Sequence, residues 1–185
     1  MAVVFVTGAA GVIGTQLVNQ LSDLGHSVFA ADLKPRPEVF SDDVSFIHGD
    51  LNDMDFDQFA ELRPDVVFHL AATFERTTET YPFFEENFRN NVALSHHVLR
   101  MTKELSHPVR FVFASSYLIY EASLYSVGKD QPAVSINELM PVNPRNLTGM
   151  AKLSTEGELQ FLSNFSDSET SFVSARIFRG FGLGS

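Results

Sequence analysis

The chain has 185 residues, 44% of them hydrophobic, so it is long enough to bury the core of one domain. Its formal net charge of −10 disfavours binding to nucleic acid, and no apolar run approaches the roughly 18 residues of a membrane span. It contains no cysteine, which excludes disulfides and thiolate metal sites and fits a cytoplasmic protein.

Short apolar segments typical of β-strands alternate with amphipathic segments typical of helices. The predicted strands are 3–6, 27–31, 45–48, 65–70, 109–115 and 171–177. Helices are predicted over 12–24, 80–105 and 148–164, and the first ends before Gly25, a common helix stop. Strands that are apolar throughout and separated by helices predict a doubly wound parallel sheet, a three-layer α/β/α fold of the Rossmann type.

Residues 121–147 contain scattered Pro, Gly and Ser without periodicity. A loop of this length in a compact domain is usually a lid or a binding segment. The chain ends soon after the predicted strand 171–177 with no helix to cover it, so we expect it to be part of a larger protein.

Two groups of titratable residues are interpreted as structural. An acidic group is predicted to form a solvated helix face; its members are Glu75, Glu79, Glu85 and Glu86. His96 and His97 are adjacent, and adjacent residues of a helix point in different directions, so no metal site is predicted.

Three glycines, Gly8, Gly11 and Gly14, lie between the first strand and the first helix in the stretch VTGAAGVIG. Glycine lets backbone N–H groups approach a pyrophosphate at a helix N-terminus. A tight strand-to-helix turn also requires glycine, so the spacing alone is weak evidence for a nucleotide.

Two aspartates strengthen the nucleotide interpretation. Asp32 ends the second strand, where a carboxylate can accept hydrogen bonds from a ribose 2′-hydroxyl and repels a 2′-phosphate. This favours NAD over NADP, a preference that the nearby Lys34 and Arg36 weaken. Asp50 follows the third strand, where it either meets adenine or belongs to a simple Gly-Asp turn.

Eight segments follow one another along essentially the whole chain in an order that is highly specific. They are TGAAGVIG, Asp32, HGDLND, DVVFHLAA, NNVALSHHVL, RFVFASSYLIY, INELMPVNPRNLTGMAKLSTE and ARIFRGFGLG. In this order the chain resembles the extended short-chain dehydrogenase/reductases, specifically the NAD-dependent sugar epimerase/dehydratase group. The resemblance implies one NAD-binding domain over 1–185 and places most sugar-nucleotide contacts in a C-terminal part absent from this chain.

The resemblance also implies individual roles. The implied cofactor-binding residues are Gly8, Ala10, Gly11, Val12, Ile13, Gly14, Asp32, Asp50, Leu51, Leu70, Ala71, Ala72, Asn91 and Lys152. Asn91 is implied to organise the active site, and Ser116, preceded by Ser115, to hydrogen-bond the reacting sugar hydroxyl. Lys152 is implied to bind the nicotinamide ribose and to lower the pKa of a neighbouring tyrosine.

Position 148 departs from the family, because the stretch NLTGMAK carries Thr148 where the family has its proton-accepting tyrosine. An aliphatic hydroxyl is too weak an acid for this role, and losing a general base typically lowers a rate by about 10²–10⁴. The substitution is either natural or introduced, and Tyr117, Tyr120 or Tyr125 is an alternative proton carrier. We therefore expect the chain to be inactive or severely weakened.

A second departure is Arg179, at a position where many members carry a substrate-contacting asparagine. Its guanidinium suits a substrate diphosphate, and a surface arginine explains it equally well. The family commonly dimerises through helices of this chain's middle region. Phe83, Phe84 and Phe88 therefore predict a homodimer, unless they belong to the core.

The favoured function is an NAD-dependent nucleotide-sugar epimerase or dehydratase that transfers a hydride transiently from a sugar carbon. The rival is a non-enzymatic relative that binds or senses a nicotinamide cofactor, against which the joint presence of Ser116 and Lys152 argues. A reductase of a non-sugar carbonyl also fits, because a fold does not determine its substrate.

Overall fold

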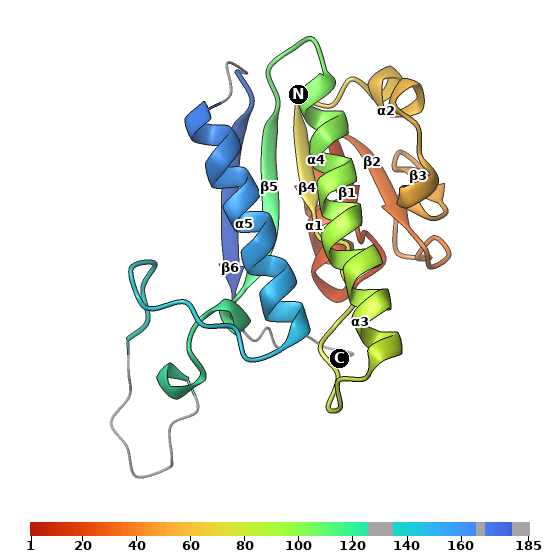
Figure 1. Ribbon diagram of the computed structural model, residues 1–185. Helices are drawn as coiled ribbons and strands as arrows, with labels where there is room; N and C mark the ends of the chain where they lie inside the picture. The colour runs from red at the N-terminus through yellow and green to blue at the C-terminus, as the bar shows by residue number, and fades with distance from the viewer. Residues whose placement is uncertain (126–134, 166–168, 179–185) are drawn as a thin grey trace.

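The computed structural model describes residues 1–125, 135–165 and 169–178 (Figure 1). Its strands are β1 (Val3–Thr7), β2 (Ser27–Asp32), β3 (Ser45–His48), β4 (Val66–His69), β5 (Arg110–Ser116) and β6 (Ser171–Ile177). They form one sheet in the order β3-β2-β1-β4-β5-β6, and every neighbouring pair is parallel. The predicted doubly wound sheet is confirmed, with its change of direction between β1 and β4.

The helices are α1 (Val12–Asp23), α2 (Phe56–Leu62), α3 (Tyr81–Asn87), α4 (Leu94–Glu104) and α5 (Leu147–Phe165). A π-helical turn, Phe88–Ala93, joins α3 to α4, so the single helix predicted over 80–105 is interrupted. The helix α2 is too short for helical periodicity and was not predicted. Asp55 and Gln58 form a capping box at its start, a local signal that was present in the sequence.

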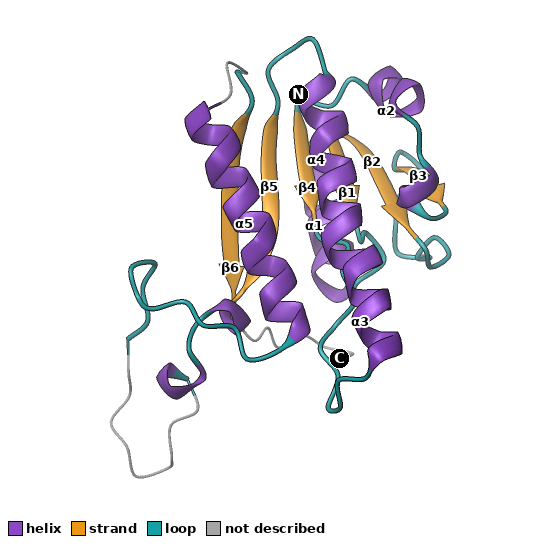
Figure 2. Ribbon diagram, in the orientation of Figure 1, coloured by secondary structure: helices purple, strands orange, loops and turns teal. Residues whose placement is uncertain are grey.

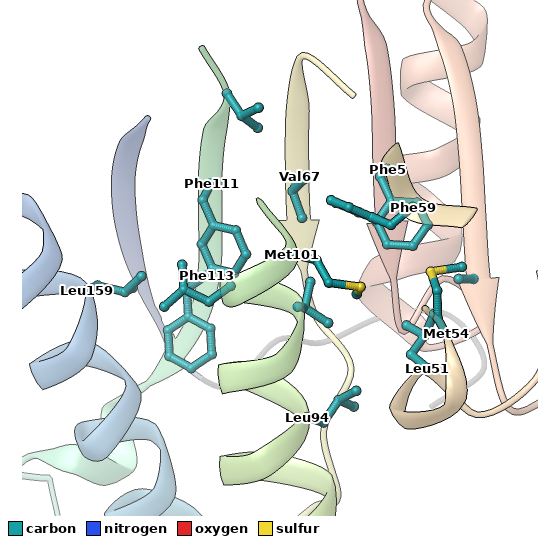
Figure 3. Close-up of a cluster of buried hydrophobic side chains, with 14 residues drawn as sticks. Phe5, Leu51, Met54, Phe59, Val67, Leu94, Met101, Phe111, Phe113 and Leu159 are labelled. Atoms are coloured by element: carbon teal, nitrogen blue, oxygen red, sulfur yellow. The ribbon is translucent and has the colours of Figure 1, made fainter. Parts of the chain in front are cut away.

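Helices cover both faces of the sheet. Figure 2 shows α4 and α5 in front of the strands and α1 behind them. Successive side chains of β1 point to opposite faces of the sheet. Val4 and Val6 pack with Val18 of α1, while Phe5 points to the opposite face. On that face, side chains of β1, β4 and β5 meet α2, α4 and α5, as the labelled residues around Met101 show (Figure 3).

The described parts of the segment after β5 form defined contacts, and residues 126–134 of the predicted loop lie outside the described residues. Tyr120 and Val142 form an isolated antiparallel bridge, so the two ends of the segment lie side by side. Arg176 of β6 fixes this base: it donates to both carboxylate oxygens of Glu156 on α5, to Tyr120 Oη at 3.0 Å and to the Glu138 carbonyl at 3.0 Å. The hydrogen bonds to Glu156 raise the pKa of Arg176 above its usual value.

Candidate cofactor pocket and active site

The turn between β1 and α1 has no room for side chains at two of its glycines. Gly8 has φ of 68°, and a Cβ there would lie 2.6 Å from the Ala71 nitrogen. A Cβ on Gly14 would overlap the Gly8 carbonyl oxygen. Val12 and Ile13 begin α1 with exposed side chains.

Asp32 closes the same turn from the end of β2. Its Oδ2 accepts from the Ala10 nitrogen at 2.8 Å and its Oδ1 from the Lys34 nitrogen at 2.8 Å. Each carboxylate oxygen has a second lone pair, so a ribose hydroxyl can still be accepted. The aspartate thus holds the glycine turn, and it also lines a cavity beside that turn.

A cavity opens at the carboxyl ends of β1, β2 and β4, where doubly wound folds bind ligands. Its lining residues are Gly8, Gly11, Ala31, Asp32, Leu33, Lys34, Gly49, Asp50, Leu51, Leu70, Ala71, Ala72, Thr73, Phe74, Asn90 and Leu94. Eight of these were predicted from the sequence. The other eight were not predicted as cofactor-binding residues, because they become neighbours of the cavity only through the fold; they are Ala31, Leu33, Lys34, Gly49, Thr73, Phe74, Asn90 and Leu94.

Asp50 lies at the cavity with most of its hydrogen-bonding capacity used. Its Oδ1 accepts from the backbone and side-chain nitrogens of Asn52, and its Oδ2 accepts from Arg89 Nη2 at 2.5 Å. Burial raises the pKa of Asp50, but the hydrogen bonds from Asn52 and Arg89 outweigh it and the net shift is downward. Asp50 therefore stays ionised, with one lone pair left on Oδ2 for a ligand.

Asn91 lies beneath the cavity wall, with 2% of its surface exposed. Its Oδ1 accepts from the Thr73 nitrogen at 2.7 Å and its Nδ2 donates to the Thr73 carbonyl at 2.9 Å. Its neighbour Asn90 lines the cavity and donates to Thr73 Oγ1. Asn90 and Asn91 are consecutive residues of the π-helical turn, and both hydrogen-bond Thr73 in the cavity wall. Turns of this kind are frequent at functional sites.

The predicted catalytic residues come from the end of β5 and the first turns of α5. Ser116 Oγ accepts from the Leu118 nitrogen at 3.2 Å, which leaves the hydroxyl proton free to donate. Thr148 and Ser115 are almost fully buried, and neither hydroxyl has a hydrogen-bond partner among the described residues. Buried hydroxyls without a partner are uncommon in proteins.

Lys152 lies one turn after Thr148 on the buried side of α5, with 6% of its surface exposed. Its Nζ is 4.7 Å from the centre of the Phe113 ring, a cation–π contact. Burial lowers the pKa of Lys152 from 10.5 to about 8. The Lys152 ammonium therefore loses its proton more readily than an exposed lysine does, and it can exchange that proton near neutral pH.

The three tyrosines named as alternative proton carriers are placed differently. Tyr120 accepts from Arg176 and is buried, so its phenol is committed to the structure. Burial raises the pKa of Tyr125, which makes it a poorer base at neutral pH. Tyr117 packs edge-on against Tyr125, with ring centres 5.0 Å apart.

The start of α5 is fixed by part of the acidic group. Asn146 caps the helix, its Oδ1 accepting from the Gly149 nitrogen, while its Nδ2 donates to Glu75 at 2.7 Å. Glu79 accepts from the Leu147 nitrogen at 2.7 Å, at the helix end that favours negative charge. The predicted helix face is therefore wrong for Glu75 and Glu79, which precede α3 and bind α5 across the fold.

The adjacent histidines His96 and His97 make contacts outside this site. His96 pairs with Glu158, and His97 Nε2 lies 2.8 Å from the Met54 carbonyl. Within 1–125, 135–165 and 169–178, no three His, Asp or Glu residues gather as a metal site. Arg179 lies outside the described residues. No helix in the described part of the chain is both long and apolar enough to cross a membrane.

Comparison with known proteins decides the family. The NAD dependent epimerase/dehydratase family matches residues 4–185. The chain belongs to this family. NAD is the family's cofactor, and the glycine turn, Asp32 and the cavity beside them are suited to hold it.

Curated relatives cover nearly the whole chain. The UDP-glucose 4-epimerase of Mycolicibacterium smegmatis is 32% identical over 178 residues, which are 91% of this chain and 53% of that protein. The D-erythronate dehydrogenase of Cupriavidus necator is 30% identical over 190 residues, covering 95% of this chain and 53% of that protein. The chain thus spans about half the length of these relatives.

Solved structures give the same picture. MoeE5 in complex with UDP-glucuronic acid and NAD has a TM-score of 0.79 and 32% identity, covering 98% of this chain and 56% of that one. A UDP-galactose 4-epimerase has a TM-score of 0.74 and 29% identity, covering 94% and 55%.

Proposed function

We propose that the chain forms the cofactor-binding part of an NAD-dependent nucleotide-sugar epimerase or dehydratase whose proton transfer is impaired. The cavity bounded by Gly8, Gly11 and Asp32 carries the proposal for NAD. Relatives and solved neighbours named for UDP-sugars support the substrate class. Thr148, in place of a phenol, supports the impairment.

When bound, NAD supplies a hydride acceptor next to the sugar carbon. Ser116 would orient the sugar by donating its free proton to the reacting oxygen. Lys152 would hold the nicotinamide ribose and exchange a proton, as its pKa of about 8 allows. Thr148 would only hydrogen-bond, because an alkoxide cannot form at neutral pH.

The hydrogen bonds that the nearby cationic residues already make support a preference for NAD over NADP. Arg36 donates to the carbonyls of Val44 and Ser41, each at 2.7 Å, so its guanidinium is used within the fold. Lys34 lines the cavity, and its backbone nitrogen donates to the Asp32 carboxylate, whose negative charge disfavours a 2′-phosphate there.

Calorimetric titration with NAD and with NADP tests this proposal. We expect the wild-type chain to bind NAD more tightly than NADP. Asp32→Ala should weaken NAD binding about tenfold or more and reduce the difference in affinity between NAD and NADP. Asp32→Asn separates charge from hydrogen bonding, and Asp42→Ala controls for loss of a surface carboxylate. Absence of binding to either nucleotide by the wild-type chain contradicts the proposal.

The rival function, cofactor binding without catalysis, is favoured by one observation. Two of the three alternative tyrosines are poor replacements for the missing phenol, since Tyr120 is bonded to Arg176 and the pKa of Tyr125 is raised. Thr148→Tyr decides between the two in a protein that includes a substrate-binding part. Turnover of a UDP-sugar eliminates the rival, and its absence across a broad sugar-nucleotide panel supports the rival.

Homodimerisation belongs to the same proposal. Tyr81, Phe84 and Phe88 are exposed on α3 and the π-helical turn, whereas Phe83, expected with them, is buried. Sedimentation of the wild type and of Phe88→Lys tests it, and a monomeric wild type contradicts it.

A further inference from the structure

A buried hydrogen-bond chain connects β1 with α4 through His69, the last residue of β4. His69 Nδ1 lies 2.8 Å from Thr7 Oγ1, and its Nε2 lies 2.9 Å from Ser95 Oγ. Thr7 Oγ1 also accepts from the nitrogens of Leu70 at 3.2 Å and Ala71 at 3.1 Å, two residues of the cavity wall. Thr7, His69 and Ser95 are all at most 1% exposed.

The partners fix the direction of every proton in this chain. Ser95 donates its only proton to the Asn91 carbonyl at 2.6 Å, so its oxygen must accept from the Nε2–H of His69. The bare Nδ1 then accepts from the Thr7 hydroxyl, which leaves two lone pairs for the Leu70 and Ala71 amides. A protonated His69 would break this order, because Nδ1–H would compete for a lone pair already in use.

The charge state of His69 agrees with this order. Complete burial, together with the positive charge of Lys152, lowers the pKa of His69 from 6.5 to about 3. The ring also packs against Phe113, with ring centres 6.0 Å apart. His69 is therefore neutral and held in one tautomer.

The chain continues to the catalytic helix. Asn91 Nδ2 donates to Thr73 and to Asn87 Oδ1 at 2.7 Å, and Asn87 Nδ2 donates to the Leu147 carbonyl at 3.2 Å. Leu147 is the first residue of α5 and directly precedes Thr148. One end of the chain thus holds the cavity wall and the other holds the turn that carries position 148.

We propose that His69 is a positioning residue: the chain Thr7–His69–Ser95–Asn91–Asn87 keeps the cofactor cavity wall in register with position 148. Its relevance to catalysis rests on the proposed function, but the coupling is a property of the fold. A histidine that served only to fill the core would contribute stability without linking the two ends.

Two half-replacements separate the links at His69. In His69→Asn the side-chain amide reaches the place of Nδ1 and keeps the Thr7 link. In His69→Gln it reaches the place of Nε2 and keeps the Ser95 link. Ser95→Ala cuts the chain with little change of volume, and Phe113→Leu is the control that loosens the same core without removing a hydrogen bond.

The reporter for the far end uses the absence of cysteine from the sequence. Thr148→Cys places a single thiol at a site that is 4% exposed, and its reaction rate with a disulfide reagent measures how well that site stays closed. NAD affinity, measured by calorimetry, reports the cavity wall. Urea unfolding gives the stability of each variant for comparison.

We expect Ser95→Ala and His69→Asn to speed thiol labelling about tenfold more than Phe113→Leu does, when variants of equal stability are compared. A tenfold change corresponds to the loss of about one buried hydrogen bond. We expect His69→Gln to weaken NAD about tenfold, while His69→Asn changes NAD affinity by about threefold or less. Labelling rates that follow global stability alone, in all variants including Phe113→Leu, overturn the proposal. If the wild type binds no NAD, the proposed function fails, yet the thiol labelling still decides the coupling.

Discussion

Gly8 lies so close to Ala71 that a Cβ at position 8 would be 2.6 Å from the Ala71 nitrogen. The turn after β1 is therefore pressed against the end of β4, and the two segments form adjoining parts of the cavity wall. Gly8 also has a positive φ of 68°, which L-residues with side chains rarely adopt. Both constraints act on the turn that a pyrophosphate would approach.

We expect Gly8→Ala to lower the free energy of unfolding by more than about 2 kcal/mol and to abolish NAD binding. Strain at positive φ accounts for about 1–2 kcal/mol, and the clash with Ala71 adds to it. Urea unfolding and calorimetry measure the two effects. Gly25→Ala is the matched control, because Gly25 has φ of 79° with no atom within 4 Å of the added Cβ. Equal losses in both variants would show that the close approach is unimportant.

The ion pair between Arg176 and Glu156 gives a second prediction. Their side chains are 20% and 10% exposed, so Arg176→Met leaves a mostly buried carboxylate and should lower stability by about 3 kcal/mol. Replacing Glu156 as well should restore part of the loss. Arg100→Met removes a half-exposed pair at 3.9 Å and should cost less than about 1 kcal/mol. Similar losses from the two arginine variants in urea unfolding would contradict this account.

Local sequence patterns were sufficient for the sheet and for the cofactor end of the site. Parallel strands are buried on both faces, so their apolar runs located all six strands to within about two residues. The glycine spacing and Asp32 depend on the turn that follows a strand, which is also local. Asp32 and two of the three glycines, Gly8 and Gly11, line the cavity.

Local sequence patterns could not predict contacts between segments that are distant along the chain. Arg89 meets Asp50 across 39 positions, and Glu79 meets the Leu147 nitrogen across 68. Nothing near either residue signals its partner, so Arg89 was overlooked and Glu79 was assigned to the solvent. The hydrogen bonds of His69 span up to 62 positions and were invisible for the same reason.

Lys152 predicts an unusual dependence of stability on pH. Burial lowers its pKa in the folded chain to about 8, while the unfolded lysine keeps its proton up to about 10.5. Between these values the unfolded chain binds more protons, so this group makes the free energy of unfolding rise with pH. At pH 7 Lys152→Met should be more stable by up to about 3 kcal/mol, at about 1.4 kcal/mol per pKa unit. Urea unfolding of both proteins from neutral to alkaline pH tests this, and parallel curves refute it.

The last prediction concerns the phenol that position 148 lacks. In Thr148→Tyr the new side chain lies one helical turn before Lys152, on the same buried face of α5. Burial alone raises a phenol's pKa, whereas a neighbouring ammonium lowers it, and the two groups titrate as a coupled pair. We expect tyrosinate absorbance to appear at a pH at least about one unit lower in Thr148→Tyr than in Thr148→Tyr combined with Lys152→Met.

Thr148→Phe provides the spectroscopic background, because it adds the same ring without a titrating group. The comparison needs neither substrate nor NAD, so it examines α5 by itself. A lower phenol pKa that depends on Lys152 would mean that α5 still provides the environment in which a tyrosine becomes a base. Identical titration with and without Lys152 would mean that the lysine no longer acts on position 148, and the non-enzymatic function would then be the better explanation of the chain.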